Sequence, residues 1–158
     1  MTVLILTVFI VILDQVTKYL LRSSMSLHES RTIIENFFNF TYVTNDGMAF
    51  GINFPGGLYI FSGVSIIMTI IIFWYLWRER WGSLLLRTAL AFILAGAVGN
   101  LIDRILYGEV ADFLDFSFWG YHWYIFNIAD SSVTIGMILF IIYSIFINTS
   151  EKSVKPVI

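Results

Sequence analysis

The chain contains no cysteine and only two histidines among its 158 residues. Without cysteine there can be no disulfide, no thiol nucleophile and no thiolate metal ligand. His28 and His122 are then the only imidazoles, so zinc chemistry is not expected. Catalysis, if any, must use oxygen and nitrogen side chains other than these.

Charge is also scarce: charged residues make up 13% of the chain, and the net charge is -2. No stretch is rich in Lys and Arg, which nucleic-acid binding needs in order to neutralise phosphates. The sequence has no His-Glu-x-x-His and no Gly-x-Ser-x-Gly motif, and Lys18 is the one lysine within an apolar run that could serve a Ser-Lys pair. These absences exclude nucleic-acid partners and leave the carboxylates as the candidate catalytic groups.

Apolar sequence is abundant: 58% of the residues are hydrophobic and the mean hydropathy is +0.83. A helix needs about 20 residues to cross the hydrocarbon core of a bilayer. Four runs are long enough, at about 1–21, 58–77, 84–105 and 124–147. We therefore predict a mainly α-helical, polytopic membrane protein with four transmembrane helices, forming a single domain over residues 1–158.

The basic residues predict the orientation of the helices, because Lys and Arg are enriched in cytoplasmic loops. Two basic residues, Arg22 just before the segment 23–57 and Arg31 within it, lie on one side of the membrane. Five lie on the other side of the membrane: Arg78, Arg80, Arg87, Lys152 and Lys155. We expect both termini to be cytoplasmic and the segment 23–57 to be extracytoplasmic.

The extracytoplasmic segment has the pattern of a small β-sheet. Phe38, Phe40 and Tyr42 alternate with less apolar residues at the period of a half-buried strand. Asn45-Asp46-Gly47 suits a hairpin turn, since these residues tolerate positive φ. The predicted return strand is 48–52.

Polar residues within the runs share both a depth and a face. Each lies near the outer end of its helix. Inserting an ionised Asp at the middle of the bilayer would cost about 2.5–3.5 kcal/mol. Spacings of three, four and seven place each group on one side of its helix. The groups are Asp14, Thr17 and Lys18; Asn100, Asp103 and Arg104; and Asn127, Asp130, Ser131 and Thr134. We predict one buried polar pocket, which Asp112 reaches from a short loop after the third helix.

Each group also has a structural interpretation. Asp14 and Lys18 can neutralise each other as an i, i+4 pair. Asp103 and Arg104 can extend toward the interface from a helix end. The other two alternatives are that Asp130 is a helix N-cap and that Asp115 is a solvated loop residue. None of these explains why the groups converge.

Two carboxyl groups close together in a poorly solvated site cannot both ionise cheaply, so the pair can share a proton near neutral pH. Such a pair supplies both the base and the acid for amide hydrolysis. Two other functions remain open. The acids could form the relay of a small ion or proton transporter, or Asp112 and Asp115 could hold Mg²⁺ in a lipid phosphotransferase.

Five motifs, in order along nearly the whole chain, resemble those of the bacterial lipoprotein signal peptidases (signal peptidase II). They are Asp14-Gln15-Val16-Thr17-Lys18, Asn45-x-Gly47-x-Ala49-Phe50, Gly96-Ala97-Val98-Gly99-Asn100-x-x-Asp103-Arg104, Val110-Ala111-Asp112-Phe113 and Phe126-Asn127-Ile128-Ala129-Asp130. Any one motif is weak evidence, but the five together are specific. One departure is Ala111, where the family commonly has valine.

The resemblance implies an aspartic endopeptidase of the bacterial cell membrane that cuts prolipoproteins before a diacylglyceryl-modified Cys. It implies that Asp112 and Asp130 are the catalytic pair, without a metal or cofactor. The implied pocket comprises Asp14, Lys18, Asn45, Gly47, Asn100, Asp103, Arg104, Asn127 and Ala129. The resemblance also implies an outer cradle with an interfacial segment, contact with membrane lipid, and inhibition by globomycin.

Overall fold

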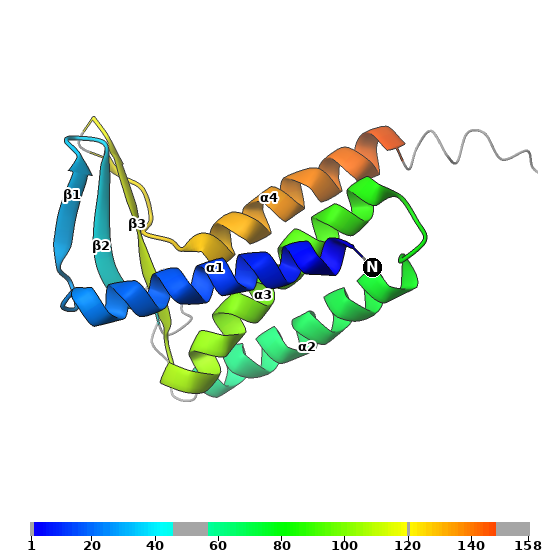
Figure 1. Ribbon diagram of the computed structural model, residues 1–158, viewed down its shortest axis with the longest axis horizontal. Helices are drawn as coiled ribbons and strands as arrows, with labels where there is room; N and C mark the ends of the chain where they lie inside the picture. The colour runs from blue at the N-terminus through cyan, green and yellow to red at the C-terminus, as the bar shows by residue number, and fades with distance from the viewer. Residues whose placement is uncertain (1, 46–56, 120, 148–158) are drawn as a thin grey trace, which may run out of the picture.

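The computed structural model describes residues 2–45, 57–119 and 121–147. In these ranges the chain forms the helices α1 (Val3–Ser24), α2 (Gly57–Arg78), α3 (Leu84–Tyr107) and α4 (Ile128–Ile142), and α4 continues into a π-helical turn, η2 (Tyr143–Ile147). Four helical stretches are long and apolar enough to cross a membrane. A small antiparallel sheet lies at one end of the helices (Figure 1). The predicted fold class is confirmed.

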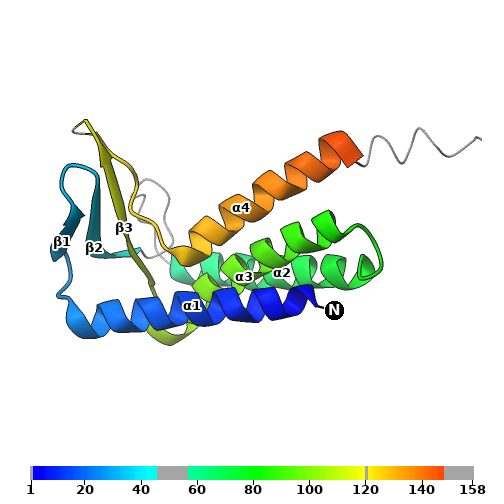
Figure 2. The same cartoon turned by 45° about the horizontal axis from the view of Figure 1, so that its top comes forward.

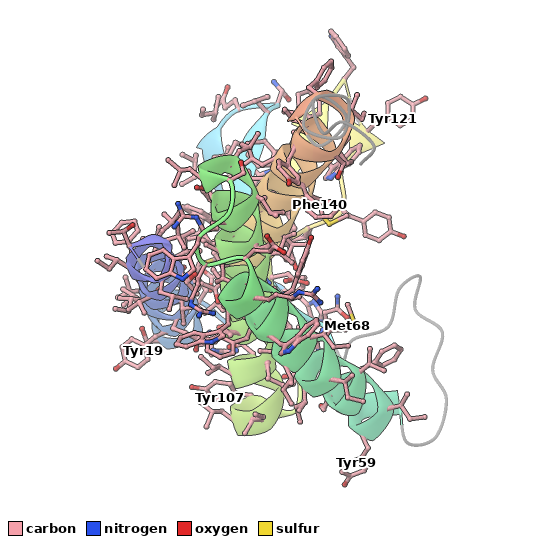
Figure 3. The ribbon with its side chains drawn as sticks, turned by 90° about the vertical axis from the view of Figure 1, so that its right-hand side faces the viewer. Tyr19, Tyr59, Met68, Tyr107, Tyr121 and Phe140 are labelled. Atoms are coloured by element: carbon pink, nitrogen blue, oxygen red, sulfur yellow. The ribbon has the colours of Figure 1, made fainter. Side chains whose placement is uncertain are left out.

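The helix α3 is central and packs against each of the other three (Figure 3). Its fully buried positions include the small residues Ala89, Ala91 and Ala95. Small side chains let neighbouring helices approach closely. A Cβ added at Gly96 would collide with the backbone of Ala129 in α4, and one at Gly99 would lie 2.7 Å from the Asp14 carboxyl in α1. Gly96 and Gly99 therefore let α4 and α1 pack closely against α3.

The outward faces of the helices are apolar. Only 6% of the membrane-spanning window in α2 is buried inside the protein, against 50% in α3. Tyr19, Tyr59 and Tyr121 point away from the molecule (Figure 3). So much exposed apolar surface is unusual for a protein in water but suits contact with lipid.

Two helix ends position the polar residues. The helix α3 ends at Gly108, whose φ of 79° is in the left-handed region that favours glycine. This turn lets the chain reverse, and a strand begins at Val110. The helix α4 begins with a capping box in which Asn127 is the N-cap and Asp130 is the third helical residue.

The sheet consists of β1 (Ser30–Ile34), β2 (Phe38–Asn45), β3 (Val110–Phe118) and the short β4 (Tyr121–His122), in the order β1-β2-β3-β4. The predicted strand that alternates at Phe38, Phe40 and Tyr42 is β2. The predicted turn residues 46–47 and return strand 48–52 lie outside the described residues.

The prediction of a loop around Asp112 was wrong, because Asp112 lies within the nine-residue strand β3. This strand pairs with β2 in a register that sets Val43 opposite Asp112 and Phe40 opposite Leu114. The partner strand is about 70 residues earlier in the chain, so local sequence gives little sign of the pairing.

The strands run across the ends of the helices in Figure 1. The start of α1 and the end of η2 both lie at the end of the molecule away from the sheet. The helix α4 is inclined to the other three, and its first turn is the part nearest the sheet (Figure 2). Turns of α1, α3 and α4 at the sheet end of the helices therefore converge near β3.

Candidate active site

Buried charges join α1 to α3. The Lys18 Nζ lies 2.9 Å from Asp14 Oδ2 and 3.1 Å from Asp103 Oδ2, and all three side chains are fully buried. Arg22 Nη2 lies 3.1 Å from the same oxygen of Asp103. Pairing of this kind compensates for the loss of hydration. The i, i+4 interpretation of Asp14 and Lys18 is correct but incomplete, and the interfacial position considered for Asp103 is wrong.

The same carboxylates hold two backbone segments. Asp14 Oδ1 accepts a hydrogen bond from the Ala129 N–H at 2.9 Å, and Asp103 Oδ2 accepts one from the Ala111 N–H at 3.1 Å. Gln15 Nε2 donates to both carboxyl groups. The buried cluster thereby fixes the first turn of α4 and the start of β3 relative to α1 and α3.

Asn100 connects this cluster to Asp130. Lys18 Nζ donates to Asn100 Oδ1 at 2.9 Å. Asn100 Nδ2 donates to Asp130 Oδ1 at 2.8 Å. A continuous hydrogen-bonded path therefore leads from the ammonium of Lys18 to the carboxyl of Asp130.

Asn127 contacts both members of the predicted catalytic pair. Its Nδ2 donates to Asp112 Oδ1 at 2.6 Å, and its backbone N–H donates to Asp130 Oδ2 at 3.2 Å. Its Oδ1 accepts from the Asp130 N–H at 2.9 Å. The interpretation of Asp130 as an N-cap is wrong, because Asn127 has that role and Asp130 completes the capping box.

The Asp112 side chain is almost completely buried, with 3% of the residue exposed. This burial and the neighbouring charge of Asp130 raise the pKa of the Asp112 carboxyl from 3.8 to about 7, against hydrogen bonds from Asn127 and Asn45 that lower the pKa. Asn45 Nδ2 lies 3.4 Å from Asp112 Oδ2. The carboxyl can therefore carry a proton at neutral pH, as one member of an acid–base pair must.

An open groove of about 400 Å³ lies beside Asp130. Its other lining residues are Trp123, Phe126, Ser131, Thr134 and Ile135. Thr134 and Ile135 lie on the exposed surface of α4. The groove thus reaches from the carboxyl of Asp130 to a helix face suited to lipid contact.

Arg104 lies near the predicted catalytic pair, whereas Asp115 lies further along β3 than Asp112. The Arg104 charge interacts with those of Asp130 and Asp112, and its Nη1 donates to Ser65 Oγ on α2 at 3.1 Å. Gly47 lies outside the described residues. Asp115 is not a solvated loop residue: it is 4% exposed, lies in β3 and accepts a hydrogen bond from Thr41 on β2.

Three residues that bond to the site, Gln15, Arg22 and Thr41, are not among the predicted site residues. Arg22 could have been found, because it follows Lys18 by four residues and so continues the polar face of α1. Gln15 and Thr41 had no such signal. Across the described ranges, no group of three or more His, Cys, Asp or Glu side chains could hold a metal ion.

Comparison with known proteins identifies a family and relatives that match nearly the whole chain. The family model of signal peptidase (SPase) II matches residues 6–146. The lipoprotein signal peptidases of Staphylococcus aureus strains JH9 and Newman are each 43% identical over 156 residues, which is 99% of this chain and 94% of theirs.

Two solved structures of bacterial membrane enzymes are also similar. One has a TM-score of 0.79 at 42% identity, and the match covers 99% of this chain and 94% of that structure's chain. The other has a TM-score of 0.78 at 41% identity, and the match covers 92% of this chain and 94% of that structure's chain. These matches and the four apolar helices identify a multi-pass bacterial membrane protein. On this evidence the chain belongs to the signal peptidase II family.

Proposed function

We propose that the chain is an aspartic endopeptidase that removes signal peptides from prolipoproteins, cutting just before the diacylglyceryl-modified Cys. The observation that carries the proposal is the pair of hydrogen bonds from Asn127 to Asp112 and to Asp130. Both carboxyl groups accept hydrogen bonds from Asn127, and Asp112 is almost completely buried. Such a pair is suited to share a proton. The substrate class follows from the relatives, which are named lipoprotein signal peptidases.

In the proposed reaction the ionised carboxyl takes a proton from water as the water oxygen attacks the amide carbon. The protonated carboxyl donates to the amide oxygen, so a neutral tetrahedral diol forms. The C–N bond then breaks as the carboxyl that took the water proton gives it to the leaving nitrogen. The other carboxyl takes a proton back from a diol hydroxyl, so the pair is restored and the new carboxyl product is released. No covalent intermediate with the enzyme is needed.

The groove beside Asp130 supports entry of the substrate from the membrane. A peptide that joins an apolar signal helix to two acyl chains would present its cleavage site at headgroup depth. The exposed surface at Thr134 and Ile135 would let this peptide approach sideways along α4. The sheet end would then be extracytoplasmic, with both termini in the cytoplasm.

Other pocket residues would bind the peptide backbone around the cleavage site. Asn45 reaches Asp112 from β2, and Arg104 lies within electrostatic range of both carboxyl groups. A cyclic peptide inhibitor of the globomycin type would compete for the same donors and acceptors. We place Gly47 in this pocket from its motif alone.

The test measures cleavage of a lipid-modified precursor by the purified protein in detergent or bilayers. Asp112→Asn and Asp130→Asn should each abolish cleavage. Asp115→Asn is the matched control, because Asp115 is also a buried Asp of β3 and accepts a hydrogen bond from Thr41 on β2; it should retain cleavage. Cleavage retained in either variant of the pair contradicts the proposal.

Two further measurements separate this function from the alternatives. A chelator should leave cleavage unchanged; inhibition that added Mg²⁺ reverses would instead favour a phosphotransferase. Proton or ion flux across sealed vesicles, without cleavage of any precursor, would favour a transporter.

A further inference from the structure

We propose that Lys18 is a positioning residue: acting through Asn100, it keeps the negative charge of the pair on Asp130, so that Asp130 is the base and Asp112 the acid. This inference rests on the proposed peptidase function. It assigns different tasks to two carboxyl groups that the motifs alone do not distinguish.

The first step is the orientation of the Asn100 amide. An ammonium group has three N–H donors and no acceptor. Lys18 Nζ lies within 3.1 Å of three oxygens, one each from Asp14, Asp103 and Asn100. The Asn100 oxygen must therefore face Lys18, and its NH₂ group must face Asp130.

The second amide is fixed independently of the first. The Asp130 backbone N–H can only donate, so it holds the Asn127 oxygen, and the Asn127 NH₂ group points to Asp112 and to Asn100 Oδ1. Asn100 Oδ1 thus accepts from Lys18 and from Asn127, which uses both of its lone pairs. If the Asn100 amide were flipped, its NH₂ group would face the Lys18 ammonium. If the Asn127 amide were flipped, its NH₂ group would face the Asp130 N–H.

The consequence for Asp130 is that each of its oxygens accepts a fixed N–H, from Asn100 at 2.8 Å and from the Asn127 backbone at 3.2 Å. Donors of this kind stabilise the ionised carboxylate. Asp130 also lies in the first turn of α4, where the helix dipole favours a negative charge. Arg104 on α3 adds a positive charge that interacts more strongly with Asp130 than with Asp112.

Asp112 has a different environment. One oxygen accepts the short bond from Asn127, and the other faces Asn45 at 3.4 Å, which is a long contact for an N–H donor. Asp112 is also the more deeply buried of the two. The charge of Lys18 also favours ionised Asp112, but burial and the charge of Asp130 outweigh it. The shared proton therefore belongs on Asp112 Oδ2, opposite the oxygen bound by Asn127.

A purely structural role for Lys18 gives a different expectation. Its bond to Asp103 holds α1 against α3, so removing the ammonium would destabilise the fold with or without Asn100. The catalytic effect of Lys18 depends on the Asn100 amide only if Lys18 acts on Asp130 through that amide. A double-mutant cycle on kcat separates the two.

The experiment compares Lys18→Met, Asn100→Ala and the double variant by kcat, KM and the pH profile of kcat, using a lipid-modified precursor and the folded fraction of each protein. Each single change should lower kcat by about a hundredfold with little change in KM. The pH profile of kcat should also change in each, because the N–H donor that faces Asp130 is lost or no longer held in place. The double variant should be no slower than either single one.

Asn100→Asp keeps the bond to Lys18 and replaces the donor that faces Asp130 by an oxygen. It should fold as well as the wild type and lose kcat, which preserves the test if Lys18→Met does not fold. Thr7→Val is the matched control: Thr7 also joins α1 to α3, by a buried bond to the Ala91 oxygen, but it has no connection to the pair. It should lower thermal stability and leave the pH profile unchanged.

The proposal would be overturned if the losses in kcat of Lys18→Met and Asn100→Ala multiply in the double variant. It would also be overturned if Asn100→Asp has the wild-type kcat and pH profile. If the wild type and Thr7→Val cleave no lipid-modified precursor, the proposed function itself has failed. The two failures are therefore distinguishable.

Discussion

Asn127 donates a side-chain N–H to Asp112 across 2.6 Å, and it does so from the N-cap position of α4. The same residue therefore starts a membrane-spanning helix and attaches that helix to a strand of the sheet. Its amide oxygen serves the cap and its amide nitrogen serves the carboxyl. Helix capping and the geometry of the pair can be separated by changing one end of this amide at a time.

Asn127→Asp should separate the two functions. Aspartate accepts the Asp130 N–H as asparagine does, so the cap persists, but the second oxygen faces Asp112 and repels it. We expect near wild-type thermal stability with cleavage lost. Asn127→Ala removes both interactions and should also cost about 1 kcal/mol of stability. Equal stability losses in the two variants would contradict the separation.

Gly96→Ala should push α4 away from α3. An added methyl group would overlap the Ala129 backbone and the Val133 side chain, and overpacking of this kind costs about 1–3 kcal/mol. Because Ala129 and Asp130 are adjacent, we expect lower thermal stability together with slower cleavage. The control is Gly63→Ala in α2, where an added Cβ meets nothing within 4 Å and both quantities should stay unchanged.

The convergence of the polar side chains could be predicted from helical spacing. A residue's depth and face follow from the rise and period of a helix, and these properties are local. Membrane insertion then requires the polar faces to turn toward one another. Asp14, Lys18 and Asp103 meet on this basis, as do Asn100, Asn127 and Asp130.

What helical spacing could not predict depends on partners distant in the sequence. Asp112 lies in a strand because β2 supplies its hydrogen bonds, and Asp115 is buried because Thr41 lies beside it on β2. Asp130 and Asn127 both suit an N-cap, and local sequence does not decide which of them precedes the first turn of α4. The contact of Ala129 with Asp14 helps to fix that turn in the folded protein.

A bulky residue in the groove should block the proposed lateral entry of the substrate. Thr134 lies on the exposed face of α4, one turn beyond Asp130, and lines the groove. Thr134→Trp should raise KM for a lipid-modified precursor by about tenfold or more, while kcat changes less, because the carboxyl groups are untouched. The control is Ile138→Trp, one turn further along α4 at an exposed position outside the groove lining. Equal effects of the two tryptophans would contradict the groove as the entry route.

The burial of Asp112 makes stability depend on pH in a predictable direction. Its pKa is raised from 3.8 to about 7 by burial and by the charge of Asp130, so the folded protein binds this proton more tightly than the unfolded chain does. Between these values the free energy of unfolding should fall as pH rises, at up to about 1.4 kcal/mol per pH unit. Below pH 3.8 the carboxyl is protonated in both states, and above pH 7 its destabilising effect is complete.

Asp112→Asn removes this dependence because an amide does not ionise and its oxygen can still accept from Asn127. Thermal unfolding in detergent at pH 5 and pH 8 measures the effect. The wild type should lose more stability between these two conditions than the variant, and at pH 8 the variant should be the more stable protein. Other groups titrate in both proteins, so only the difference between them reports on Asp112. Parallel curves for the two proteins would mean that the Asp112 carboxyl is ionised in the folded state across this range, and the acid of the proposed pair would then have to be sought elsewhere.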